Sequence, residues 1–225
     1  TPDGTPYTNP ILINQSASVA TGDLSTFLDQ APDQYKRQLG ITRVDVNQNG
    51  DAVAVWEKAG DKLSLYYRRF NPFTNVYQEE AMLEPLADEM FWQVDQTISM
   101  NNSGNFVISW AELPTSSPTN ELNSRIYAKI VYSDATTSSR IDLPSDTSVT
   151  GYSRPHTQMR STGEFIAAWS KYINSNKNEA DTYMRSFSST GTPYQSSDIL
   201  VSSNPGKEFR VSFDFSETDP ENLDF

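Results

Sequence analysis

The sequence contains three versions of one short stretch: GDAVAVW at residues 50–56, GNFVISW at 104–110 and GEFIAAW at 163–169. In each version a glycine lies six residues before a tryptophan, and most of the intervening residues are apolar. The glycines are separated by 54 and 59 residues, which indicates an internal repeat with loops of variable length. A period of this size is typical of one supersecondary unit stacked beside its copies.

The residues around each stretch predict further strands in the same unit. A turn-like string of Asn, Ser, Thr, Arg or Gln ends at each glycine, which predicts a tight hairpin after a preceding strand. The glycine-to-tryptophan run is apolar on both faces, as expected for a strand that is covered on both sides. Aromatic segments at 66–70, 127–131 and 183–187 predict a third strand, and residues 199–201 predict a fourth.

Both ends of the chain resemble parts of the repeat. GTPY at residues 4–7 recurs at 191–194, so the N-terminus is predicted to be the tail of a repeat. The run FRVSFDF at 209–215 is predicted to open another repeat. Either these ends complete a fourth unit together, or the chain is part of a longer array or assembly. The predicted single repeat domain divides into a tail strand (1–14), a connection with a short helix (15–40), repeats 1 to 3 (41–87, 88–146 and 147–204) and the head of a further repeat (205–225).

The predicted fold class is all-β. Four short strands in a unit of roughly fifty residues describe a blade of a β-propeller, and this is the architecture we expect. Tandem β-sandwiches are the alternative, although a sandwich would not naturally produce three similar units of this length.

The repeats also resemble a known type. The pattern Gly-x-Phe-Val-x-x-Trp, a variable loop, Tyr-x-x-Arg-Phe, a turn and Gly-x-Pro is similar to β-propeller-like repeats of large secreted and surface-attached bacterial proteins. The resemblance implies a binding or display module more than an enzyme. It is carried in the third copy by Gly163, Phe165, Ile166, Trp169, Tyr183, Arg185, Phe187, Gly191 and Pro193, and in the first by Tyr66, Arg69 and Phe70.

Composition excludes several classes of function. The net charge of −12 argues against nucleic-acid partners, which require a basic surface. With no cysteine there is no disulfide framework or thiolate chemistry, and a lone histidine (His156) disfavours a catalytic triad or a His-rich metal centre. No apolar run is long enough to insert into a membrane. We expect an extracellular or cell-surface protein, bacterial in type, that requires no cofactor.

One string has the spacing of a calcium loop. Asp45, Asn47, Asn49 and Asp51 would present oxygen atoms at alternate positions, and Gly50 would allow a sharp turn. The twelfth position of such a loop holds Trp56 instead of a bidentate glutamate. A plain hairpin turn is therefore the competing interpretation, and calcium stays an alternative.

A second set of candidates concerns the mouth of the propeller channel. Trp92 lies outside the repeated strand, in the predicted connection to the second repeat, and similar connections carry Arg37, Arg154 and Arg210. Aromatic and arginine side chains gathered there would stack on a sugar or hold an anion. The competing interpretation is that they pack between blades.

These observations leave three functions open. The first is a non-enzymatic binding, adhesion or display module, whose ligand is a glycan or a protein held at the channel mouth. The second is a carbohydrate-active hydrolase with a pair of carboxylates on the same face. The third is a purely structural subunit of a surface fibre or appendage. The hydrolase candidates are Glu57, Asp95, Glu112 and Asp181, and no motif singles out two of them.

Overall fold

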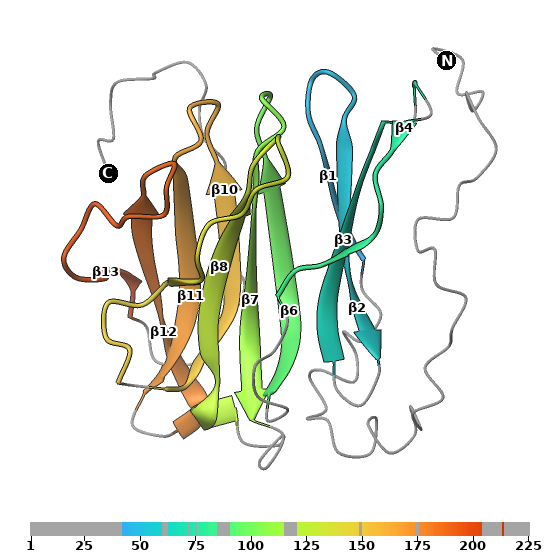
Figure 1. The fold of residues 1–225 in the computed structure, drawn as a ribbon. Coiled ribbons are helices and arrows are strands. Elements are labelled where there is room, and N and C mark those ends of the chain that lie inside the picture. The colour runs from blue at the N-terminus through green and yellow to red at the C-terminus, as the bar shows by residue number, and fades with distance from the viewer. Residues whose placement is uncertain are drawn as a thin grey trace, which may run out of the picture.

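The computed structural model describes residues 42–59, 63–71, 73–74, 76–84, 91–114, 121–148, 150–173, 176–203 and 213. Within these residues the strands form three antiparallel sheets that follow one another along the chain (Figure 1). No helix in this part of the protein is long and apolar enough to cross a membrane. The predicted tail strand, the helix in 15–40 and the head at 205–225, apart from Phe213, lie outside the described residues.

Each sheet is built from consecutive strands, and we call the sheets blades 1 to 3. Blade 1 contains β1 (Arg43–Val46), β2 (Ala52–Ala59), β3 (Leu63–Asn71), β4 (Val76–Tyr77) and β5 (Ala81–Met82). Blade 2 contains β6 (Phe91–Met100), β7 (Phe106–Pro114), the 3-10 helix η1 (Glu121–Asn123), β8 (Arg125–Val131) and β9 (Ile141–Asp142). Blade 3 contains β10 (Tyr152–Met159), β11 (Phe165–Ile173), β12 (Asn176–Phe187) and β13 (Ile199–Ser202). In blade 1, β4 and β5 both pair with β3, so two short pieces replace the fourth strand.

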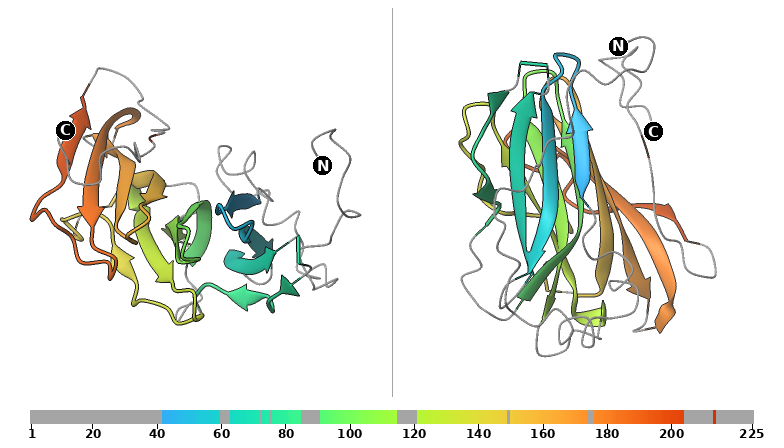
Figure 2. Two further views of the ribbon diagram at one scale, coloured as in Figure 1. Left: turned by 90° about the horizontal axis from the view of Figure 1, so that it is seen from above. Right: turned by 90° about the vertical axis from the view of Figure 1, so that its right-hand side faces the viewer.

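The three blades stand side by side in an arc. Seen from above, they fan out with β1, β6 and β10 along the inner side (Figure 2). These first strands contact one another, β1 with β6 and β6 with β10. The all-β, blade-like prediction is therefore confirmed. Tandem sandwiches are excluded, because the sheets succeed one another around an axis instead of packing in separate pairs.

The core lies between the blades. Val53, Val55 and Leu65 of blade 1 pack against one face of blade 2, which includes Phe106 and Trp110. The other face of blade 2 packs against blade 3. Every residue of β7 except Pro114 is buried, which explains why its sequence is apolar on both faces. The repeat tryptophans are core residues: Trp56 is 7% exposed, Trp110 is 0% and Trp169 is 1%.

Strand register confirms the repeat and corrects one detail of it. The tryptophan of each second strand lies opposite a tyrosine of the third: Trp56 faces Tyr66, Trp110 faces Tyr127 and Trp169 faces Tyr183. The counterpart of Arg185 is consequently Arg68, whereas Arg69, which fits the Tyr-x-x-Arg-Phe spacing, corresponds to Ser186. Arg68 Nε donates to the Gln78 carbonyl oxygen at 2.8 Å, and Arg185 Nε donates to that of Gln195 at 3.0 Å.

The predicted hairpins are also confirmed. The turn glycines Gly50, Gly104 and Gly163 have φ values of 82°, 79° and 90°, a conformation that glycine adopts without steric cost. Each glycine N–H bonds to the carbonyl oxygen three residues earlier, which closes the turn between the first and second strands of its blade.

Candidate functional site

The proposed calcium string forms the turn between β1 and β2, and its oxygens already accept hydrogen bonds. Asp45 Oδ2 accepts the N–H of Met100 at 2.7 Å, and Asp45 Oδ1 accepts that of Val46 at 2.8 Å. Asn47 Oδ1 accepts the N–H groups of Asn49 and Asp51 at 3.0 and 2.9 Å. These side chains therefore shape the turn and bind blade 2. Calcium binding here stays a prediction, and the ion would compete with those donors. In the described ranges no three His, Cys, Asp or Glu residues group as a metal site.

The two proposed rim residues that the structure describes do not lie in connections. Trp92 and Arg154 belong to the innermost strands β6 and β10, so their predicted location was wrong. Trp92 is only 5% exposed and belongs to the core between the blades, as the competing interpretation predicted. Arg154 remains partly exposed. Arg37 and Arg210 lie outside the described residues.

Arg154 and Asp95 occupy the same unusual position in neighbouring blades. Each lies nine residues before the turn glycine of its blade. Both have a left-handed backbone, with φ of 58° for Asp95 and 52° for Arg154, which is uncommon outside glycine. The register of β6 shifts between Val94 and Thr97, and that of β10 shifts between Ser153 and His156. Two equivalent β-bulges therefore hold two ionisable side chains.

The bulges lie opposite the repeat tryptophans. In blade 2, Ala111 and Ser109 of β7 pair with residues of β6, so the bulge in β6 lies opposite Trp110 between them. In blade 3 the bulge in β10 lies opposite Trp169 in the same way. Bulges are common beside binding and active sites, where they redirect a side chain. A position-by-position comparison of the repeats would have paired Asp95 with Arg154. No feature of the sequence, however, predicts the bulge itself.

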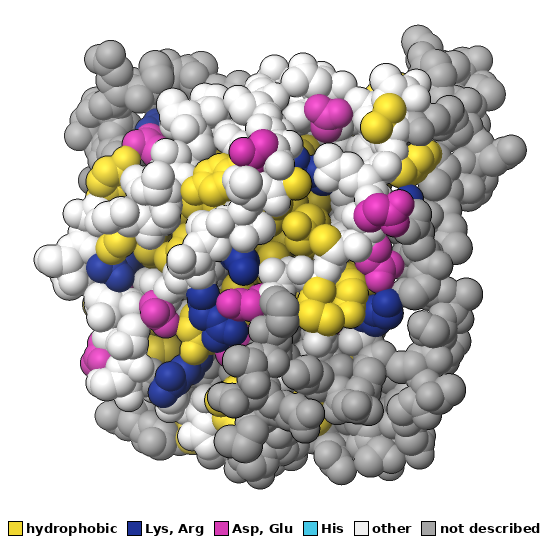
Figure 3. Space-filling view, viewed as in Figure 1, with side chains coloured by type: hydrophobic (Ala, Val, Ile, Leu, Met, Phe, Trp, Pro, Cys, Tyr) yellow, Lys and Arg dark blue, Asp and Glu magenta, His cyan; other side chains and the backbone are white. Residues whose placement is uncertain are grey.

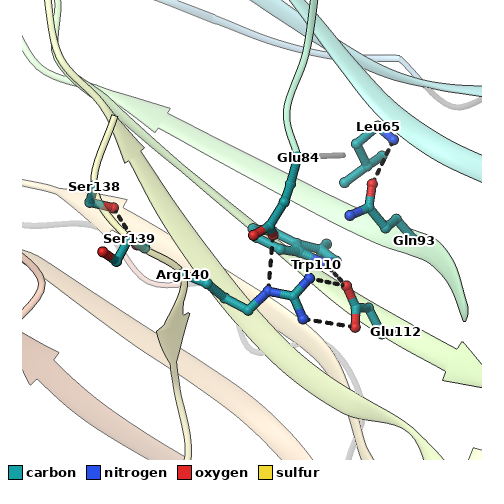
Figure 4. Close-up of polar contacts among 8 residues, drawn as sticks. All are labelled: Leu65, Glu84, Gln93, Trp110, Glu112, Ser138, Ser139 and Arg140. Atoms are coloured by element: carbon teal, nitrogen blue, oxygen red, sulfur yellow. Dashed lines mark hydrogen bonds and ion pairs between the residues drawn. The ribbon is translucent and has the colours of Figure 1, made fainter. Parts of the chain in front are cut away.

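Buried polar groups accompany both bulges. Thr97 Oγ1 lies 2.7 Å from Ser109 Oγ and 3.3 Å from Thr157 Oγ1, which places β6 and β10 in direct contact beside the bulges. Gln93 and Ser153 are fully buried. Gln93 Oε1 accepts the Leu65 N–H at 2.9 Å (Figure 4), but its Nε2 and the Ser153 Oγ make no hydrogen bond within the described structure. Buried polar atoms without a hydrogen-bond partner are rare in native cores, and each one requires an explanation.

Glu112, a hydrolase candidate, belongs to an ion-pair network between blades 1 and 2 (Figure 4). Arg140 contacts both of its carboxylate oxygens, at 2.9 and 3.1 Å, and also binds Glu84 at 3.0 Å. Trp110 Nε1 donates to Glu112 Oε1 at 3.3 Å. Burial raises the pKa of Glu112, and the Arg140 charge opposes that shift. The sequence analysis missed Glu84 and Arg140, since neither lies in the repeat motif.

Blade 1 holds the same ion pair with its charges reversed. Lys58 lies two residues after Trp56, as Glu112 does after Trp110, and it pairs with Glu80 at 2.9 Å. Glu80 lies two residues before Met82, the partner of Tyr66 on β5. Arg140 likewise lies two residues before Asp142, the partner of Tyr127 on β9. The cations also lie over equivalent rings, Lys58 over Tyr66 at 4.5 Å and Arg140 over Tyr127 at 4.4 Å. This equivalence assigns Glu112 a structural role in holding the fourth strand.

The remaining carboxylate candidates are scattered. Glu57 pairs with Leu65 across β2 and β3, whereas Asp181 pairs with Lys171 across β11 and β12 in another blade. Of the four, Asp95 is the one that lies on an innermost strand.

Comparison with known proteins identifies the architecture. By sequence the chain matches no family model, and no curated protein matches it either. Its fold is similar to that of the α-L-arabinofuranosidase Arb93A from Fusarium graminearum, solved with an iminosugar inhibitor, with a TM-score of 0.53 and 10% sequence identity. The similarity covers 78% of this chain and 52% of that one. The fold is that of a β-propeller.

A second propeller gives a weaker match. The α-L-arabinanase of Penicillium chrysogenum, complexed with arabinobiose, has a TM-score of 0.48 and 13% identity over 78% of this chain and 53% of that chain. The protein described here thus spans about half the length of the propellers it matches. At these identities the likeness concerns the fold alone.

Proposed function

We propose that the protein binds carbohydrate, without hydrolysing it, along the innermost strands of blades 2 and 3. The observation that carries the proposal is the pair of equivalent bulges at Asp95 and Arg154. Left-handed backbone at a residue other than glycine costs about 1–3 kcal/mol and concentrates at functional sites. Its occurrence at the same position of two blades favours a shared role for these positions.

The chemistry of the two side chains suits a neutral glycan. A carboxylate accepts hydrogen bonds from sugar hydroxyls and a guanidinium donates to them, so a pair of opposite charges selects hydroxyl-rich ligands without selecting a net charge. A hydrolase of the usual kind needs two carboxylates about 5–10 Å apart. Blade 3 carries Arg154 at the position where blade 2 carries Asp95, which favours binding over catalysis.

The fold and the composition are consistent with this proposal. The similar arabinofuranosidase holds an iminosugar, so arabinose-containing oligosaccharides are the first ligands to test. A net charge of −12 and the absence of cysteine suit an extracellular or cell-surface protein.

The test is a glycan-array screen of the folded protein, followed by affinity measurements on variants. Asp95→Asn and Arg154→Gln should each weaken binding at least about tenfold, a loss of about 1.4 kcal/mol. Asparagine tolerates the left-handed backbone, so the first variant should fold normally. Asp142→Asn and Arg125→Gln, which change exposed residues on β9 and β8, are the matched controls.

Three outcomes would contradict the proposal. Unchanged affinity in both bulge variants would remove the site. A blank array would favour a protein partner or a structural spacer. Release of reducing sugar from arabino-oligosaccharides, lost in Asp95→Asn, would favour the hydrolase alternative.

A further inference from the structure

A cleft of about 370 Å³ lies between blades 1 and 2, at the end of the sheets that carries the glycine turns. It is not part of the bulge site, and none of its lining residues belongs to the sequence motifs discussed for the channel mouth. In the space-filling view, hydrophobic side chains are visible among backbone and uncharged side chains near the centre of the face (Figure 3). The residues that line the cleft include Asp51, Arg69, Phe70, Asn71, Met100 and Ser103.

One wall of the cleft is a fixed carboxylate. Asp51 Oδ1 accepts a hydrogen bond from Asn71 Nδ2 at 2.8 Å, and Oδ2 accepts one from Asn47 Nδ2 at 3.3 Å. Asn71 is itself held, because its Oδ1 accepts the N–H groups of Phe73 and Thr74 at 3.0 and 3.1 Å. Each carboxylate oxygen keeps capacity for a second donor. The wall is therefore preorganised to accept hydrogen bonds.

A second wall is a guanidinium that reaches across the blade boundary. Arg69 of blade 1 donates to the carbonyl oxygens of Val131, Tyr132 and Ser133 in blade 2, with Nη1 to Ser133 at 3.1 Å. Its guanidinium carbon lies 4.6 Å from the centre of the Phe106 ring. Burial lowers the pKa of Arg69, and the charges of Tyr67, Asp134 and Asp51 oppose that shift. The cation is thus held rigidly by neutral groups.

These two charges line one cleft without neutralising each other. In the described part of the chain, neither Arg69 nor Asp51 forms an ion pair within 4.0 Å. The floor adds apolar surface from Phe70 and Met100. A ligand that satisfies both walls must accept a hydrogen bond and donate another, carry no large net charge, and offer an apolar face to the floor.

We propose that this cleft is a second ligand site, which takes a single neutral sugar unit through neighbouring hydroxyl groups. One hydroxyl accepts from the Arg69 guanidinium, an adjacent one donates to the Asp51 carboxylate, and the C–H face of the ring packs on Phe70. The cleft volume lies at the small end of the range for ligand pockets, which suits a single sugar ring. For so small a site we expect a dissociation constant in the millimolar range.

The test uses the full chain and a panel of free monosaccharides, L-arabinose, D-galactose, D-xylose and D-glucose, monitored by backbone amide shifts in NMR. At least one sugar should shift the amides of Asp51, Asn71 and Ser103. Ser103→Phe places a ring at an exposed lining position and should abolish those shifts. Thr162→Phe is the matched control, because Thr162 precedes the turn glycine of blade 3 as Ser103 precedes that of blade 2, and it does not line the cleft.

The outcomes separate this site from the bulge site. Loss of the shifts in Ser103→Phe, with Asp95→Asn unaffected, would support the cleft. No sugar-induced shift at these amides up to the solubility limit, or shifts that persist in Ser103→Phe, would overturn it. Shifts that vanish only in Asp95→Asn would assign all binding to the innermost strands.

Discussion

Asp45 of blade 1 accepts a hydrogen bond from the backbone N–H of Met100 in blade 2, at 2.7 Å. Ser99 of blade 2 does the same for Met159 of blade 3, at 2.9 Å. The acceptor lies five residues before the turn glycine of its blade, and the donor lies four residues before the glycine of the next blade. We call this contact the inter-blade clasp.

Loss of the clasp should destabilise the boundary that it spans. Asp45→Ala leaves the buried N–H of Met100 without its partner, so the free energy of unfolding should fall by about 1–3 kcal/mol. Ser99→Ala, which removes a neutral acceptor, should lie at the lower end of that range. Urea denaturation measures both. Equal stability of wild type and Asp45→Ala would show that the clasp contributes nothing.

The same turn decides the calcium question. Because the oxygens of Asp45, Asn47 and Asp51 already accept N–H donors, we expect the melting temperature to be the same in calcium and in chelator. Differential scanning calorimetry under both conditions provides the measurement. A rise in calcium that disappears in Asp51→Asn would instead establish the metal site anticipated from the sequence.

Breaking the network around Glu112 should be costly. Arg140→Met leaves the buried Glu112 carboxylate without its cation and should reduce the free energy of unfolding by about 3 kcal/mol. Glu112→Gln should cost less, because Arg140 is partly exposed and keeps its ion pair with Glu84. The exchanged pair Glu112→Lys with Arg140→Glu should recover part of that loss, because blade 1 already holds this order in Lys58 and Glu80. Recovery should be incomplete, since Glu84 would then face a like charge. A double variant no better than the singles would contradict the equivalence of the two pairs.

The lone histidine should make stability depend on pH. His156 packs edge-on against Phe213, with ring centres 5.1 Å apart. Burial lowers its pKa, the Arg43 charge lowers it further, and a backbone hydrogen bond with Phe213 opposes both. The folded protein then binds the proton less readily than the unfolded chain, so stability is complete above about pH 6.5 and decreases as the pH falls below it.

The control for this effect is His156→Phe, which keeps an aromatic ring and cannot titrate. Unfolding free energies at about pH 7.5 and about pH 5.5 should differ more for the wild type than for this variant. Equal pH dependence in the two proteins would assign the effect to other groups.

The repeat predicted the architecture because two physical conditions recur in every blade. A strand buried between two neighbouring sheets must be apolar on both faces, and a tight hairpin needs glycine where φ is positive; Gly104 and Trp110 fulfil both conditions. The burial of Trp92 agrees with the competing interpretation that it packs between blades. The sequence left both interpretations open because an aromatic residue outside the repeated motif can be either buried or exposed.

The bulges and the charge networks could not be predicted for a different reason. A bulge changes the register without changing the local composition, so Asp95 and Arg154 look like ordinary strand residues. The reversed pairs Lys58–Glu80 and Glu112–Arg140 satisfy the same geometry with opposite residue types. A comparison of the repeats that looks for the same charge at the same position therefore overlooks these pairs.

The inter-blade clasp is also asymmetric, and this asymmetry affects which blades can be neighbours. At each boundary the acceptor is a side chain of the earlier blade, whereas the donor is a main-chain N–H that almost any residue of the later blade supplies. In this contact, only the earlier blade therefore needs a particular side chain. A blade with a short acceptor at that position can precede many different successors, so such units can be duplicated, exchanged or appended while their loops and inner strands diverge.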